Sequence, residues 1–190
     1  SRVLKISGKG ADKGKSPLYI NFHGGGFVRG YHLRDTVFCA QAVLATGALV
    51  LDVDYRLAPE HPFPAALNEC YDIVAWTFEN ADTLGVDRDR IAIGGHSAGG
   101  NFAAAICIMA QAEGKFLPCG QVLDYPFLDG ITPPTDKVDP RSVMTAERME
   151  AYNVLYAEVP ENLYNPLLSP VEASQEALEG LPPALMLIAG

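Results

Sequence analysis

The 190-residue sequence lacks the cysteine patterns that mark zinc sites and disulfide frameworks. Its four cysteines, Cys39, Cys70, Cys107 and Cys119, never stand in a Cys-x-x-Cys spacing, and each lies among apolar neighbours. We therefore expect four buried free thiols in a reducing compartment and no bound metal. No secretory signal opens the chain, so a cytoplasmic location is expected.

Long apolar runs and an excess of basic residues are missing too. The best candidate for a membrane helix, Phe38 to Leu51, is interrupted by Gln41, Thr46 and Gly47, and a span needs roughly 18 apolar residues. Fourteen Lys and Arg against 23 Asp and Glu give a net charge of −9, which repels phosphate backbones. We therefore expect neither a membrane span nor a nucleic-acid partner. Hydrophobic residues make up 48% of the sequence, which suffices for a packed globular core.

Short apolar runs alternate with segments of helical periodicity. The runs expected as strands are Arg2–Ile6, Leu18–Phe22, Ala48–Val53, Ile91–Gly94, Gln121–Tyr125 and Ala184–Ala189. The segments expected as helices are Asp35–Thr46, which ends at the C-cap Gly47, Ala66–Asn80, Ser97–Ala112 and Ala146–Ala157. The turn between the first two strands is rich in Gly and Lys and predicts a hairpin. The alternation as a whole predicts an α/β fold with a mostly parallel sheet flanked by helices.

Residues 129–181 depart from this alternation. They contain a Pro-rich loop, Ile131 to Arg141, and one clear helix with Met149, Tyr152 and Tyr156 on one face. A long insertion between two core strands forms either a cap over a site or an ordinary surface excursion, and the sequence favours neither. We treat residues 1–190 as a single, incomplete domain with 129–181 as its cap or insertion segment.

The clearest chemical motif is GHSAG (95–99), which fits G-x-S-x-G between a predicted strand and a predicted helix. Glycines permit the sharp strand-to-helix turn that lifts the Ser97 hydroxyl clear of the sheet. The helix N-terminus directs its free N–H groups at the same point. The alternatives are a glycine-rich turn with an idle serine and a phosphate site.

A second motif, HGGGF (23–27), directly follows the predicted strand Leu18–Phe22. Three successive glycines leave backbone N–H groups unshielded, as an oxyanion hole requires. A phosphate-binding loop is disfavoured because no Lys-Ser/Thr pair follows, and a flexible turn is the remaining alternative.

Together with DYRLAPEHPFPAAL (54–67) and YPFLD (125–129), these motifs resemble the hormone-sensitive-lipase-like carboxylesterases of the α/β-hydrolase superfamily. NPLLSP (165–170) and LPPALMLIAG (181–190) fit the same family. The resemblance implies an α/β-hydrolase fold and hydrolysis of short-acyl esters through a serine acyl-enzyme, without a cofactor. The expected partner is a small-molecule ester, and a homo-oligomer stays open. A non-catalytic ligand receptor on the same fold and an amide hydrolase such as an arylformamidase are the alternatives.

By position in the motifs, Ser97 matches the nucleophile of the family. The resemblance assigns the oxyanion donors to the amides of Gly25, Gly26 and Ala98, and the shaping of the loop to His23 and Gly24. Phe27 and Tyr31 are expected to line the acyl pocket.

Two further residues receive structural interpretations. His96 stands where members with this YRLAPEHPFPA segment most often carry an acidic residue, and we interpret it as supporting the turn rather than as catalytic. Arg56 is expected to form a structural ion pair with Glu60 beneath the site, with substrate contact as the alternative.

A catalytic base of the expected kind is missing. In this fold the triad follows the order Ser, Asp or Glu, His, yet the four histidines, at positions 23, 32, 61 and 96, all precede Ser97. The family's N-terminal cap helices also have no counterpart. We therefore expect an internal fragment, truncated at both ends, whose triad acid and base lie beyond residue 190 and which has at most trace activity alone.

Overall fold

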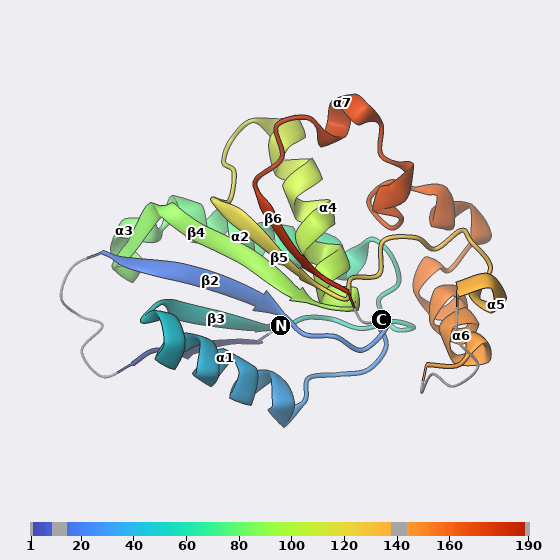
Figure 1. The fold of residues 1–190 in the computed structure, drawn as a ribbon, viewed down its shortest axis with the longest axis horizontal. Coiled ribbons are helices and arrows are strands. Elements are labelled where there is room, and N and C mark those ends of the chain that lie inside the picture. Colours follow the sequence, from blue (N-terminus) through green and yellow to red (C-terminus); the bar gives the residue numbers. More distant parts are fainter. Residues whose placement is uncertain (1, 9–14, 138–143, 189–190) are drawn as a thin grey trace.

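The computed structural model describes residues 2–8, 15–137 and 144–188. Within these residues six strands form one sheet in the order β1-β3-β2-β4-β5-β6 (Figure 1). The strands are β1 (Arg2–Ile6), β2 (Ser16–Phe22), β3 (Leu49–Asp54), β4 (Val86–His96), β5 (Gly120–Asp124) and β6 (Ala184–Leu187). β1 runs antiparallel to β3 and every other pair is parallel, which confirms the mostly parallel sheet.

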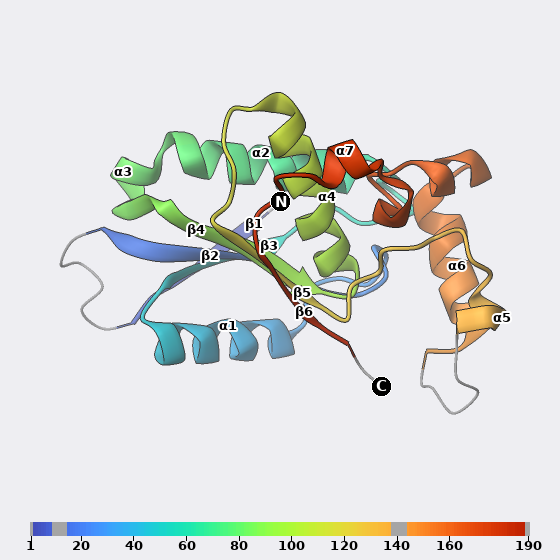
Figure 2. The same ribbon diagram turned by 45° about the horizontal axis from the view of Figure 1, so that its top comes forward.

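Helices cover both faces of this sheet. The long ones are α1 (Leu33–Thr46), α2 (Ala65–Glu79), α4 (Ala98–Glu113) and α6 (Ala146–Ala157). The short ones are α3 (Ala81–Leu84), α5 (Pro134–Lys137), η1 (Pro160–Tyr164), η2 (Pro170–Glu172) and α7 (Gln175–Leu178). α1 lies on one face and α2 and α4 lie on the other (Figure 2). Gly47 ends α1 in the left-handed conformation at φ 70°, as expected of a glycine C-cap.

The predicted hairpin of the first two strands is wrong. β1 pairs with β3, from Arg2 opposite Asp54 to Ile6 opposite Val50, and β2 lies on the other side of β3. Alternating apolar residues indicate that a strand is half-buried, but they do not encode which strand it pairs with. Much of the expected turn, residues 9–14, lies outside the described residues.

The core lies between the sheet and α4. Twelve of the sixteen residues of α4 are buried, because the helix is apolar or small on nearly all sides. Phe102 of α4 packs edge-on against Phe22 of β2, with ring centroids 6.4 Å apart. This packing fixes the start of α4 against the ends of the central strands.

Three of the four cysteines are buried free thiols, as predicted. They are Cys39, Cys70 and Cys107. Burial raises the pKa of the Cys107 thiol to about 12, which keeps it protonated and unreactive. The prediction is wrong for Cys119, which is exposed because it lies in the loop just before β5.

The segment from 129 to 181 packs against the body of the fold. Tyr156 of α6 and Leu168 are each only 1% exposed. Asn101 of α4 donates hydrogen bonds from Nδ2 to the carbonyl oxygens of Phe127 (2.8 Å) and Leu168 (2.7 Å). Residues 138–143, which include the end of the predicted Pro-rich loop, lie outside the described residues. Among the helices of the described ranges, none has the length and apolar character needed to cross a bilayer.

Candidate active site

Ser97 occupies the turn between β4 and α4 with a strained backbone, at φ 55° and ψ −117°. Its N–H donates to the carbonyl of Asp124 at the end of β5 (2.9 Å). Its own carbonyl accepts from the N–H groups of Phe127 and Asn101, both at 3.1 Å. These three hydrogen bonds fix the turn and hold Ser97 in its unfavourable backbone conformation.

Glycines let this turn lie directly on the end of β2. A Cβ atom at Gly95 or Gly99 would collide with the carbonyl oxygen of Phe22. A Cβ atom at Gly24 would come within 2.7 Å of the His96 ring. The two glycine-rich motifs begin at His23 and Gly95, 72 positions apart in the sequence, and are therefore in direct contact.

The loop after β2 turns sharply at its glycines. Gly25 and Gly26 have φ values of 140° and 61°, and the N–H of Arg29 donates to the carbonyl of Gly25 (2.9 Å). The structure shows no acceptor within the described residues for the backbone N–H groups of Gly25, Gly26 or Ala98. Three uncommitted donors on two adjacent segments are what an oxyanion hole requires.

His23 anchors this loop from beneath. Its buried ring stacks on Tyr55, with centroids 4.0 Å apart, and its Nδ1 donates to the carbonyl of Gly24 (2.9 Å). The Tyr55 hydroxyl in turn donates to the carbonyl of His23 (2.7 Å). Burial lowers the pKa of His23, so the ring is neutral at pH 7 and acts as a structural support.

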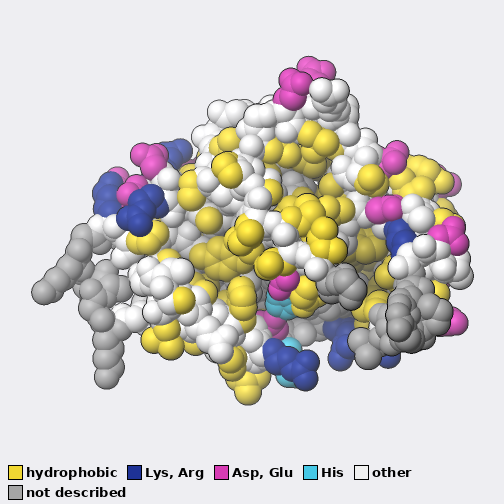
Figure 3. Space-filling view, in the orientation of Figure 1, with side chains coloured by type: hydrophobic (Ala, Val, Ile, Leu, Met, Phe, Trp, Pro, Cys, Tyr) yellow, Lys and Arg dark blue, Asp and Glu magenta, His cyan; other side chains and the backbone are white. Residues whose placement is uncertain are grey.

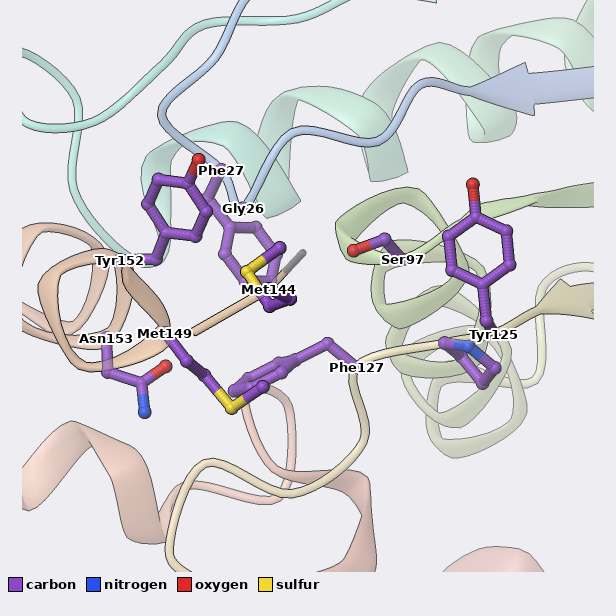
Figure 4. A pocket seen from close by; sticks show the side chains of 10 residues that line it. Gly26, Phe27, Ser97, Tyr125, Phe127, Met144, Met149, Tyr152 and Asn153 are labelled. Carbon is purple, nitrogen blue, oxygen red and sulfur yellow. The ribbon is translucent and has the colours of Figure 1, made fainter. Parts of the chain in front are cut away.

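A cavity of about 500 Å³ opens beside Ser97, and the Ser97 hydroxyl points into it (Figure 4). We call it the apolar cavity; it is lined by Gly26, Phe27, Ser97, Tyr125, Pro126, Phe127, Met144, Met149, Tyr152 and Asn153. α6 supplies three of these side chains, from Met149, Tyr152 and Asn153. Phe27 is only 3% exposed and stacks on Tyr156 at 3.8 Å, so it forms the fixed floor of the cavity.

Tyr31 lies elsewhere. It is not among the described residues that line the apolar cavity, and its hydroxyl donates to Asp52 Oδ2 (2.7 Å). Asp52 is fully buried in β3 and also accepts from Asn21 Nδ2 (2.8 Å). The structure thus ties Tyr31 to the sheet below the glycine loop and does not bring it to this cavity.

His96 points toward α1. Its Nε2 lies 2.9 Å from Asp35 Oδ1, and Asp35 Oδ2 accepts from the backbone N–H of His32 (3.0 Å). Burial raises the pKa of Asp35, but the hydrogen bonds from His96 and His32 outweigh burial and hold it below its ordinary value. The contact is in keeping with a supporting role for His96.

The predicted ion pair of Arg56 with Glu60 is wrong. Arg56 Nε lies 3.2 Å from Glu69 Oε1, and the Arg56 backbone N–H donates to Glu69 Oε2 (2.8 Å). Because α2 begins at Ala65, its first turns bring Glu69 beside Arg56.

A family profile described as "alpha/beta hydrolase fold" matches residues 19–190. The chain belongs to this family. It is 36% identical over 182 residues to esterase LipI of Mycobacterium tuberculosis, covering 94% of this chain and 56% of that protein. It is 34% identical over 179 residues to an ethyl acetate hydrolase of Pseudomonas putida, covering 93% and 55%. The hydrolase fold and the resemblance to hormone-sensitive-lipase-like esterases are thereby confirmed.

Solved structures of esterases superpose closely on this α/β hydrolase. A hyperthermophilic esterase from Pyrobaculum calidifontis matches with a TM-score of 0.86 and 38% identity, covering 97% of this chain and 65% of that one. The chain spans about half the length of the curated relatives it matches.

Sequence reasoning missed the two buried carboxylates that support this hydrolase site. Asp35 follows His32 by three positions, which is the spacing of a capping box. This spacing could have marked Asp35 as a hydrogen-bonding residue at the start of α1. Asp52 interrupts an otherwise apolar strand, which also marks it as a residue with a buried partner. Neither signal identifies the partner itself.

No histidine is hydrogen-bonded to Ser97 in the part of the chain that the structure describes. His23 supports the glycine loop, His32 caps α1 and His96 pairs with Asp35. Likewise, no group of three or more His, Cys, Asp or Glu side chains within the described ranges is arranged to hold a metal ion.

Proposed function

We propose that the protein is a carboxylic ester hydrolase in which Ser97 is the nucleophile. The Ser97 hydroxyl attacks the ester carbonyl carbon, and the carbonyl oxygen takes up the negative charge. The N–H groups of Gly25, Gly26 and Ala98 stabilise this oxyanion, the alcohol leaves with a proton, and water then releases the acid from the acyl-enzyme. The observation that carries the proposal is that, within the described residues, the N–H groups of Gly25, Gly26 and Ala98 beside the serine have no acceptor.

Short acyl chains suit the apolar cavity. Phe27, Phe127 and Met149 line it with apolar surface, and its volume of about 500 Å³ is at the small end for ligand sites. The names of the esterase relatives, the ethyl acetate hydrolase among them, support esters as the substrate class.

The catalytic base is proposed to lie outside residues 1–190. Support comes from the four histidines, three of which make contacts that hold the fold together, and from the order Ser, acid, His of this fold. Without the base, oxyanion stabilisation alone retains only a remnant of the catalysed rate.

The test compares p-nitrophenyl acetate turnover by residues 1–190 with turnover by the product of the reading frame extended past residue 190. We expect trace activity from the first and esterase activity from the second, falling about 10⁴-fold or more on Ser97→Ala. Full activity of residues 1–190 that vanishes on Ser97→Ala would place the base inside this chain. Binding of esters without turnover in the extended protein would favour a ligand receptor.

A further inference from the structure

A second cavity, of about 390 Å³, adjoins the apolar cavity at Ser97. It shares Gly26, Ser97, Tyr125, Met144 and Tyr152 with the apolar cavity. Its remaining lining residues are Gly24, Gly25, Arg29, Gly30, His32, Arg34, Asp35 and His96. Ser97 therefore stands between an apolar compartment and one that carries two guanidinium groups.

Both guanidinium groups belong to exposed side chains. Neither Arg29 nor Arg34 forms a side-chain ion pair with another described residue, whereas Arg2 and Arg56 do. Figure 3 shows histidine, basic and acidic side chains together over the beginning of α1, below a broad hydrophobic area.

The carboxylate in the described lining does not neutralise them. Asp35 is only 4% exposed, and both of its oxygens are engaged, one by His96 and the other by the N–H of His32. The described lining of the second cavity thus carries two exposed guanidinium groups and one buried, hydrogen-bonded carboxylate.

The two arginines line the same cavity as Ser97. The Arg29 N–H donates to the carbonyl of Gly25, in the glycine loop itself. Arg34 lies in the first turn of α1, where a cation opposes the helix dipole and so weakens the helix. The helix dipole therefore does not favour an arginine at position 34.

We propose that this second cavity binds a carboxylate carried by the ester substrate, a few atoms from the carbonyl that Ser97 attacks. The inference rests on the proposed function, because the reacting carbonyl must sit at Ser97. The apolar substituent of the ester then lies over Phe27 and Phe127, and its carboxylate meets Arg29 and Arg34 as charge-assisted hydrogen bonds.

Two kinds of ester carry such a carboxylate. In a monoester of a short dicarboxylic acid it belongs to the acyl group, and in an acylated hydroxy acid it belongs to the alcohol. Both kinds of ester carry an anionic group near the scissile bond. One ligand of each kind is therefore tested, so that the experiment distinguishes a carboxylate on the acyl group from one on the alcohol.

The experiment measures binding by calorimetry at low ionic strength to the Ser97→Ala protein, which cannot turn the ligands over. The ligands are 4-nitrophenyl hemisuccinate and O-acetylmandelate, each paired with the primary amide that replaces its carboxylate. We expect at least one carboxylate to bind about tenfold tighter than its amide. Arg29→Gln and Arg34→Gln should each remove most of the preference for the carboxylate over the amide. Arg29→Lys and Arg34→Lys should each keep part of this preference.

Arg90→Gln is the matched control, since it removes the same charge from an exposed position of β4 outside the cavity. It should leave the preference unchanged. Equal affinity for carboxylate and amide, no binding of either carboxylate, or a preference untouched by both Gln variants would overturn the inference. Ser97-dependent hydrolysis of p-nitrophenyl acetate tests the proposed function separately, because that ester carries no charge and needs neither arginine.

Discussion

At the scale of single residues, Asp35 joins three parts of the site. It accepts from the first turn of α1 through His32 and from the residue before the proposed nucleophile through His96. His96 in turn packs where a side chain at Gly24 would lie. One buried carboxylate therefore couples α1, the Ser97 turn and the glycine loop.

Replacing Asp35 by Asn should destabilise the protein by about 1–3 kcal/mol at pH 7, because a charge-assisted hydrogen bond to a buried carboxylate is lost. The folded-state pKa of Asp35 is depressed, so its contribution is full above the ordinary value of 3.8 and is lost as the pH falls through the folded value. Urea unfolding at pH 7, 5 and 3 should show the gap between wild type and Asp35→Asn closing only below pH 4. The exposed Asp89→Asn is the control, and a gap that is absent at pH 7 contradicts the account.

The local motifs of the site could be predicted from sequence and its distant supports could not. GHSAG and HGGGF carry their own backbone requirements, because glycine alone permits the φ values and close approaches involved. Asp35 and Asp52 act through partners about 60 and 30 positions away, His96 and Asn21, and nothing local in the sequence names those partners. The same holds for Arg56, whose partner depends on where α2 begins.

At the scale of elements, α6 links the segment 129–181 to the glycine loop. Its Tyr156 stacks on Phe27 with an interplanar angle of 6° and packs edge-on against Phe63, with centroids 5.8 Å apart. The Phe63 N–H also donates to the Tyr156 carbonyl (2.8 Å). Helix periodicity predicted α6 with its observed bounds. The predicted pairing of β1 with β2 was wrong, because periodicity indicates which residues are buried and not which strands pair.

Tyr156→Ala should cost about 3–5 kcal/mol, because it empties a site between Phe27 and Phe63. Tyr156→Phe should change stability by less than about 1 kcal/mol, since the buried hydroxyl has no hydrogen-bond partner among the described residues. Thermal or urea unfolding of both variants measures the difference. If the Phe variant proves as unstable as the Ala variant, the hydroxyl has a partner that this account omits.

At the scale of the whole molecule, the sheet ends in an apolar strand. Within the described residues β6 pairs with β5 alone, and its Leu185 and Leu187 are 59% and 48% exposed. An edge strand of this kind offers unpaired backbone groups and apolar side chains to a second copy.

Residues 1–190 should therefore self-associate as their concentration rises, which light scattering measures. Leu185→Lys should reduce the association, because a charge on an edge strand opposes strand-to-strand pairing. Leu44→Lys, at a position of α1 that is 84% exposed, is the matched control and should have a smaller effect. A monodisperse monomer at all concentrations would show that this edge is not adhesive.

The central claim is that Ser97, facing the amides of Gly25 and Gly26, is the nucleophile. The most direct measurement treats the protein extended past residue 190 with a short-chain alkyl phosphonate ester and maps the adduct by peptide mass spectrometry. The account predicts modification of Ser97 alone and none in Ser97→Ala. An adduct on another side chain, equal labelling of the Ala variant, or no adduct at all would contradict it.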